Sequence, residues 1–121
     1  MPKEQPPPVQ PPPTRADARR NREKLMEVAA LAFSEQGAAA SLEDIARRAG
    51  VGIGTLYRHF PTREALYEAV YRREVEQLGD LAEQLQNAPE PVEALRRWLR
   101  ANVQFVATKK GMVAALALVA L

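Results

Sequence analysis

A cluster of hydrogen-bonding side chains follows a glycine-rich turn near the middle of this sequence. Residues 50–60 read Gly-Val-Gly-Ile-Gly-Thr-Leu-Tyr-Arg-His-Phe, directly after a short apolar pattern that begins at Ser41. An arginine fork matches the O6 and N7 acceptors of guanine, and threonine, tyrosine and histidine can bond phosphates. Two short helices on a glycine turn have the length of a helix-turn-helix, whose second helix enters the major groove of duplex DNA. The spacing therefore predicts binding to double-stranded DNA.

The residues expected to touch DNA lie on the outward side of the second short helix and at two neighbouring helix starts. Leu56 and Phe60 are one turn apart and are expected to point inward, which leaves other side chains of this helix outside. The six predicted DNA-binding residues are Ser41, Thr55, Tyr57, Arg58, His59 and Arg63. Arg58 is the expected base reader. The other five are expected to bond phosphates, and Thr55 can also reach a base edge.

Several positions have a second, purely structural interpretation that the sequence leaves open. Tyr57 could be a core aromatic whose hydroxyl reaches the surface, and His59 could simply cap the helix end. Residues 53 and 54 could serve only the turn. For Arg47 and Arg48, solvated charges on the first short helix are the favoured interpretation.

Helical periodicity predicts the elements that position this cluster. Helices are expected at residues 17–36, 42–49, 53–60, 63–86, 91–108 and 112–121. Because helices this short are marginal alone, the first three must share one core. The expected core residues are Leu25, Phe33, Leu42, Ile45, Val51, Leu56 and Phe60. Gly37 is expected to end the first helix in the left-handed conformation, and Gly50 and Gly52 are expected to need positive φ in the turn.

The second half of the chain also carries helical patterns. Its expected inward-facing residues are Leu66, Val70, Leu78, Leu81 and Leu85, followed by Val92, Leu95, Leu99 and Val106. Lys109, Lys110 and Gly111 are expected to end the fifth helix, and a sixth helix that is apolar on every side should follow. The sequence has no alternating β-branched run and no hairpin dipeptide, so the predicted fold class is all-α.

Composition narrows the function classes. The chain has 121 residues, of which 46% are hydrophobic, and it has no cysteine, which excludes disulfides, thiol catalysis and cysteine-based metal sites. The glycines at 50, 52 and 54 follow a helix rather than a strand, and no H-E-x-x-H or G-x-S-x-G motif is present. We therefore expect no enzyme activity, no metal and no cofactor. Residues 15–24 carry five basic side chains against two acidic ones, which suits an anionic duplex or a solvated helix face equally well.

The two ends of the sequence differ in composition. Seven of the ten prolines fall within the first thirteen positions, which predicts a disordered tail over residues 1–14. The sequence shows no secretory signal and no apolar run long enough to cross a bilayer, so we expect a cytoplasmic protein. It ends within an apolar helix, which predicts a truncated chain. The expected organisation is a DNA-binding domain at residues 15–62 and a partial helical regulatory domain at residues 63–121.

The motif resembles the DNA-binding domain of the TetR family of bacterial transcriptional regulators. The resemblance is carried by Ser41-Leu-x-x-Ile-Ala-x-x-Ala-Gly-Val, Gly54-Thr-Leu-Tyr-x-His-Phe and Thr62-Arg-Glu-Ala-Leu, and it covers about residues 19–72. Residues 98–112 are similar to the SbtR-like subgroup. The chain departs from the pattern at Gly52, where many relatives have serine as the cap of the recognition helix, so one phosphate contact is lost.

The resemblance implies an α-helical homodimer that represses an operator, at the bacterial nucleoid, until a small-molecule effector binds. Trp98, Phe105 and Met112 are candidates for the effector pocket, although helical core packing is the favoured interpretation for them. Two other function classes stay open. One is a constitutive DNA-binding module without ligand control, and the other is a helical protein–protein adaptor.

Overall fold

The computed structural model describes residues 14–120, without the side chains of residues 38 and 115–120. The proline-rich segment predicted to be a disordered tail therefore lies outside the described residues, apart from Thr14. The helices, in chain order, are α1 (Arg15–Gln36), a short 3-10 turn η1 (Gly37–Ala39), α2 (Leu42–Arg48), α3 (Ile53–His59), α4 (Arg63–Leu85) and α5 (Pro91–Ala120). The described residues contain helices and connections, so the all-α prediction is confirmed.

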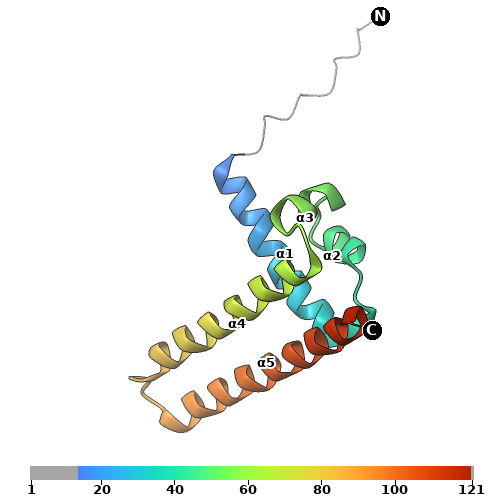
Figure 1. The fold of residues 1–121 in the computed structure, drawn as a ribbon. Coiled ribbons are helices and arrows are strands. Elements are labelled where there is room, and N and C mark those ends of the chain that lie inside the picture. The colour runs from blue at the N-terminus through green and yellow to red at the C-terminus, as the bar shows by residue number, and fades with distance from the viewer. Residues whose placement is uncertain (1–13, 121) are drawn as a thin grey trace, which may run out of the picture.

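The helices form two regions that both pack on α1 (Figure 1). Helices α2 and α3 lie against α1 as a three-helix unit, and α4 and α5 run side by side in opposite directions as a long hairpin. The C-terminal end of α5 returns to the end of α1 and to η1. The hairpin is thus attached to the three-helix unit both where α4 begins and where α5 ends.

The predicted core of the three-helix unit is confirmed. Its most deeply buried side chains are Leu25, Phe33, Ile45, Leu56, Phe60, Leu66 and Val70, and Val51 packs at its edge. Phe33 and Tyr67 contact each other edge to face, with ring centroids 4.8 Å apart, so the first turns of α4 belong to this core. Burial of these side chains supplies the stability that seven-residue helices lack on their own.

Local capping explains where the short helices begin and end. Gly37 and Gly50 adopt positive φ values of 55° and 76°, as predicted, because the chain reverses sharply at both points. The same prediction is wrong for Gly52, whose φ of −74° is open to any residue. Gly52 serves instead as the N-cap of α3 and supplies no side-chain hydrogen bond there. Thr14 and Asp17 form a capping box at the start of α1, and the carboxyl pKa of Asp17 is lowered, chiefly by its bond from the Thr14 backbone.

The predicted end of the fifth helix at Lys109-Lys110-Gly111 is wrong, because α5 continues without a break to Ala120. Gly111 does not turn the chain. It allows α5 to cross α1 at close range: a Cβ built on Gly111 would lie 1.8 Å from the carbonyl oxygen of Phe33. Tertiary packing therefore overrides the local stop signals, and no separate sixth helix forms in the described range.

The predicted inward face of α5 is also wrong. Val92, Leu95, Leu99 and Val106 are between 48% and 73% exposed. The side of α5 that packs on α4 and α1 instead carries Ala94, Trp98, Phe105, Thr108 and Met112. Apart from Thr108, both sets are apolar at helical spacing, so periodicity alone does not choose between them. Within residues 14–120, none of the helices has the combination of length and apolar character that crossing a membrane requires.

Candidate nucleic-acid interface

Helix α3 has one side turned into the core and one side left open. Leu56 is fully buried and Phe60 is 1% exposed, so these two residues anchor the helix as predicted. On the other side Arg58 is exposed and Tyr57 is 44% exposed, which removes the interpretation of Tyr57 as a core aromatic. Thr55 lies between the two sides and is partly exposed. The hydrogen-bonding groups of α3 are therefore presented on its surface.

Ser41 begins α2, the helix that supports α3. Its side-chain oxygen accepts a 3.0 Å hydrogen bond from the backbone N–H of Asp44 and so caps the helix. The Asp44 carboxylate pairs with Arg47 on the same helix. A hydroxyl that accepts from the helix retains its own proton to donate. Ser41 can therefore cap α2 and donate to a phosphate at the same time.

His59 ends α3 beside two cations. Its pKa is lowered, first because burial disfavours the charged ring, and then because the Arg22 and Arg58 guanidinium groups repel a second positive charge. The imidazole is therefore neutral at pH 7. A neutral imidazole can donate one hydrogen bond to a phosphate oxygen but brings no charge to it.

Arg63 lies in the first turn of α4, just after the turn that ends α3. Its guanidinium donates a 3.2 Å hydrogen bond to the hydroxyl of Tyr67, one turn further along the helix. This bond occupies one of the five guanidinium N–H groups, and the others can still reach a phosphate. The predicted residues thus lie on neighbouring elements. Thr55, Tyr57, Arg58 and His59 belong to α3, Arg63 begins α4, and Ser41 directly precedes α2.

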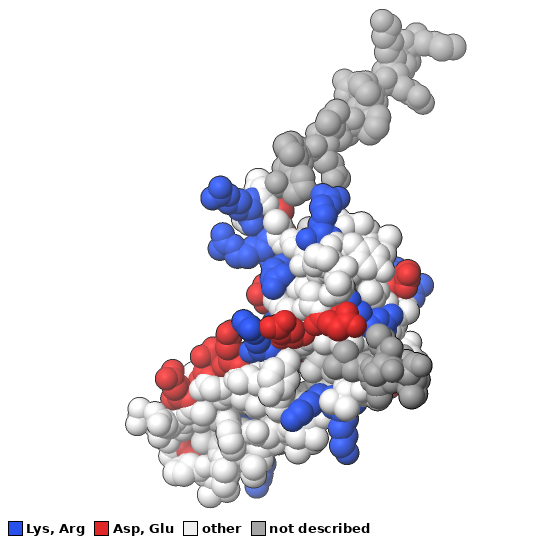
Figure 2. Space-filling view, in the orientation of Figure 1, with Lys and Arg blue, Asp and Glu red and all other residues white. Residues whose placement is uncertain are grey.

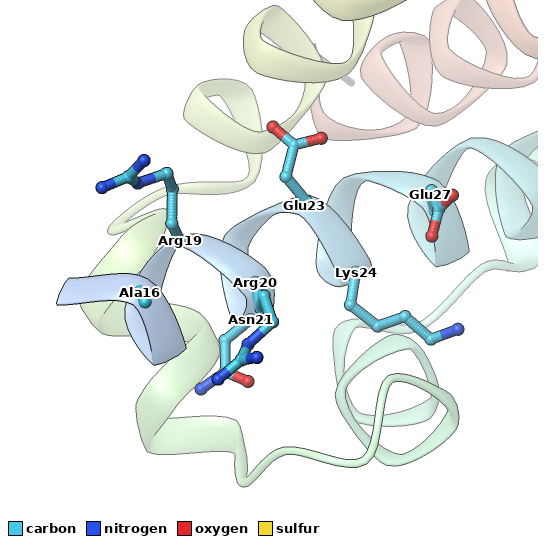
Figure 3. A pocket seen from close by; sticks show the side chains of 7 residues that line it. All are labelled: Ala16, Arg19, Arg20, Asn21, Glu23, Lys24 and Glu27. Atoms are coloured by element: carbon cyan, nitrogen blue, oxygen red, sulfur yellow. The ribbon is translucent and has the colours of Figure 1, made fainter. Parts of the chain in front are cut away.

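The surface charge is uneven. Lys and Arg side chains gather at the N-terminal end of α1, on the same end of the molecule as α3, and acidic side chains follow α4 (Figure 2). A shallow hollow on this part of α1 is lined by Ala16, Arg19, Arg20, Asn21, Glu23, Lys24 and Glu27 (Figure 3). All of these belong to one helix, so the hollow is an open basic surface rather than an enclosed pocket. Such a surface attracts polyanions from solution.

Comparison with known proteins points to one family of regulators. Residues 25–70 match the model of the bacterial regulatory proteins of the tetR family. Two solved structures share the fold. A TetR transcription regulatory protein from Mycobacterium vanbaalenii is 47% identical with a TM-score of 0.72, and a TetR transcriptional regulator from Streptomyces coelicolor is 52% identical with a TM-score of 0.71. The chain is therefore similar to the TetR family of bacterial regulatory proteins, in sequence over residues 25–70 and in fold over most of its length.

The family model covers the chain from α1 to the first turns of α4. An HTH-type transcriptional regulator of Staphylococcus aureus is 40% identical over 63 residues, which are 51% of this chain and 34% of that protein. The alignment with the Mycobacterium structure covers 85% of this chain and 62% of that one, and for the Streptomyces structure the shares are 82% and 57%. The chain therefore spans about a third of the curated relative and about three fifths of the two solved structures.

The three candidate effector residues all lie on the packed side of α5. The indole N–H of Trp98 donates a 3.3 Å hydrogen bond to the Leu78 carbonyl, and Phe105 lies 5.8 Å from Tyr71 between ring centroids. Met112 is buried in the core. The structure does not bring them into one cavity: Trp98 lines a hollow near the α4–α5 connection, and Met112 lines an apolar groove at the other end of the hairpin. Their role in effector binding stays a prediction.

Arg22 makes a contact that the basic run at residues 15–24 does not predict. Its guanidinium lies over the Phe60 ring and reaches the end of α3. A signal was present, because Arg22 precedes Leu25, Met26 and Ala29 by three, four and seven positions and so lies on the buried side of α1.

Proposed function

We propose that this chain is the DNA-reading part of a bacterial transcriptional regulator and that α3 reads the operator from the major groove. The observation that carries the proposal is the division of α3, with Leu56 and Phe60 buried and Tyr57 and Arg58 exposed. A recognition helix needs this arrangement, because its anchors must hold it while its donors reach base edges. Arg58 is the proposed base reader, and Ser41, Thr55, Tyr57, His59 and Arg63 are the proposed phosphate contacts.

The proposal includes control by a small molecule and action as a repressor. Residues 15–62 would form the DNA-binding domain, and residues 63–121 would form the first part of a regulatory domain in a homodimeric protein. In a dimer the two recognition helices must match half-sites about 34–36 Å apart, so a small tilt of each recognition helix weakens binding to the operator. The regulator would act in the cytoplasm, at the nucleoid.

Contacts at two places support a mechanical link between the α4–α5 hairpin and the three-helix unit. On α4, Arg73 makes a 3.1 Å ion pair with Glu23 and a 3.7 Å ion pair with Glu27, both on α1. At the other attachment, Gly111 of α5 lies against the backbone of Phe33 in α1. A ligand that moves either helix of the hairpin would therefore move α1, on which α2 and α3 rest.

Selection from a random duplex library tests the DNA-binding proposal. The chain is expected to enrich a defined sequence, and its affinity for that duplex should fall steeply as salt rises, with a log–log slope near −0.9 for each phosphate neutralised. Arg63→Ala should weaken binding to every duplex alike and make the slope shallower by about one. Recovery of random sequences with salt-independent affinity would favour the protein–protein adaptor instead.

Control by a small molecule is tested by a separate measurement, on the regulator in the length and assembly that the cell produces. Candidate small molecules should lower operator affinity in a gel-shift assay. If the enriched duplex is bound equally well in the presence of every compound, the chain acts as a constitutive DNA-binding module, and only the switching part of the proposal is lost.

A further inference from the structure

The side chain of Arg22 joins α1 to the C-terminal end of α3. Its guanidinium carbon lies 4.6 Å from the centroid of the Phe60 ring, within the range of a cation–π contact. One terminal nitrogen donates a long hydrogen bond of 3.5 Å to the backbone carbonyl of His59. These contacts connect residues far apart in sequence, 37 positions for His59, and they meet at the last residue of the helix and the residue after it.

The end of α3 needs such a partner. The last carbonyls of a helix have no N–H within the helix to bond, and they carry the negative end of the helix dipole. The chain leaves helical geometry at Phe60, with φ −134° and ψ 86°, and the next residue is Pro61, which has no N–H to donate. A guanidinium at this point supplies both a donor and a positive charge. Because α3 has only seven residues, its end is held by packing and capping rather than by its own length.

We propose that Arg22 is a positioning residue for DNA reading, which fixes the C-terminal end of α3 against α1 and thereby sets the direction in which Tyr57 and Arg58 point. This inference rests on the proposed function of α3. Arg22 acts through α3 and makes no base contact of its own. Without it, the donors of α3 would still be present but would be spread over a range of orientations, so the correct duplex would lose more affinity than a random one.

The competing role for Arg22 is a phosphate contact like that of any basic residue on α1. Its neighbour Arg20 shows the contrast. The Arg20 side chain is 75% exposed and pairs only with Asp17 on its own helix, so it can turn toward a polyanion. Arg22 is half-buried, and its fork is already engaged by a ring and a carbonyl on another element. The two arginines therefore form a matched pair, of equal charge and on the same helix, of which Arg22 contacts α3 and Arg20 pairs within α1.

The experiment compares Arg22→Met with the control Arg20→Met in the full chain. Methionine keeps the length and apolar bulk of the arginine stem and removes the charge and the donors. Affinity is measured for a duplex enriched from a random library by the unsubstituted chain and for an unselected duplex of equal length, each over a salt series. Arg22→Met is expected to lower the ratio of the two affinities about tenfold, the factor that 1.4 kcal/mol produces, at an unchanged salt slope. Arg20→Met should leave the ratio unchanged.

An unchanged affinity ratio in Arg22→Met, with a shallower salt slope, would overturn the proposal and make Arg22 a phosphate contact. If Arg22→Met fails to fold by circular dichroism, Arg22→Lys decides, because lysine keeps the charge at the helix end but loses the planar fork. A ratio reduced about threefold at an unchanged slope supports positioning, and an unreduced ratio refutes it.

A measurement without DNA separates this inference from the proposed function. If the unsubstituted chain enriches no sequence, the function proposed for α3 fails, and NMR spectra of the free chain then decide the role of Arg22. Arg22→Met should shift the amide signals of residues 57–60 and raise the titration midpoint of His59, because a neighbouring cation is removed. Arg20→Met should do neither. Identical amide signals of residues 57–60 in the two variants would show that Arg22 does not fix the end of α3.

Discussion

The three-helix unit and the α4–α5 hairpin bury their apolar residues to very different extents. In α1, α2, α3 and the first two turns of α4, the large apolar side chains converge on one core around Phe33, Leu56 and Phe60. Along α5 an entire face from Val92 to Val106 stays exposed, and the helix is tied down mainly near Thr108 and Met112. Tight packing is therefore concentrated in the three-helix unit, whereas the hairpin is held at its base. Substitutions of the same kind in the two regions should therefore have different effects.

The largest difference is expected between two leucine truncations. Leu56→Ala empties a fully buried position and should lower the free energy of unfolding by about 2–5 kcal/mol. Leu99→Ala removes a side chain that is 51% exposed, and the change should stay within about 0.5 kcal/mol. Urea denaturation monitored by circular dichroism measures both. Equal losses of unfolding free energy in the two variants would contradict the division into a packed three-helix unit and a hairpin with an exposed apolar face.

Two glycine substitutions test where the hairpin is attached. Gly111→Ala would place a methyl group 1.8 Å from the Phe33 carbonyl oxygen, so α5 must move away from α1, at a cost of about 1–3 kcal/mol. Gly79→Ala lies in α4, has no neighbour within 4 Å and should gain about 0.5–1 kcal/mol from helix propensity. Opposite signs in thermal denaturation are the expected outcome. Stabilisation by both substitutions would mean that α5 does not cross α1 at Gly111.

The second attachment is electrostatic and should matter less. The Arg73 side chain is 17% exposed and pairs with two glutamates of α1, so Arg73→Met should cost roughly 1 kcal/mol. The neighbouring pair of Arg72 and Glu68 is exposed and lies within α4, and Arg72→Met should cost only a few tenths of a kcal/mol. The difference between the variants should shrink in high salt. A larger loss for Arg72→Met would show that α4 is not fastened to α1 through Arg73.

The smallest effect is the pH dependence contributed by His59, the only histidine of the chain. Its pKa is lowered below 6.5, so the unfolded state binds the proton more readily than the folded state. The contribution of His59 to stability is therefore fully present above pH 6.5 and is lost as the pH falls from 6.5 through the folded-state value. Melting temperatures from pH 7.5 to 5.5 should show a decline that His59→Gln removes. An NMR titration midpoint above 6.5 would reverse the sign and contradict the assigned environment.

Much of the structure of the three-helix unit could be predicted from its sequence, because local rules and tertiary packing agree there. The inward positions of Leu56 and Phe60 and the positive φ at Gly50 follow from spacing and residue type. Helix α5 was harder because local signals conflicted with packing. Its lysines and Gly111 resemble a helix end, but close contact with Phe33 keeps the helix intact. Its two apolar stripes are equivalent in sequence, so only the position of α4 shows which one is buried.

The candidate site shows the same limit at the level of single residues. The sequence supplies the types and spacing of Thr55, Tyr57 and Arg58, and the structure adds which side of α3 they occupy. The sequence alone does not show that Arg22 reaches the Phe60 ring, because that contact depends on how α1 and α3 cross. A basic residue on an otherwise apolar stripe is the local sign of such a contact.

The central claim is that the exposed side of α3 reads bases through Arg58. Its most direct test is the base preference of Arg58→Ala, measured at every position by selection from a random duplex library, with the exposed Arg97→Ala on α5 as control. The account predicts that Arg58→Ala loses discrimination at one base-pair position, worth about 1–3 kcal/mol, and keeps the preferences elsewhere. Arg97→Ala should keep them all. An Arg58→Ala variant that selects the same sequence with the same stringency at every position would contradict the account.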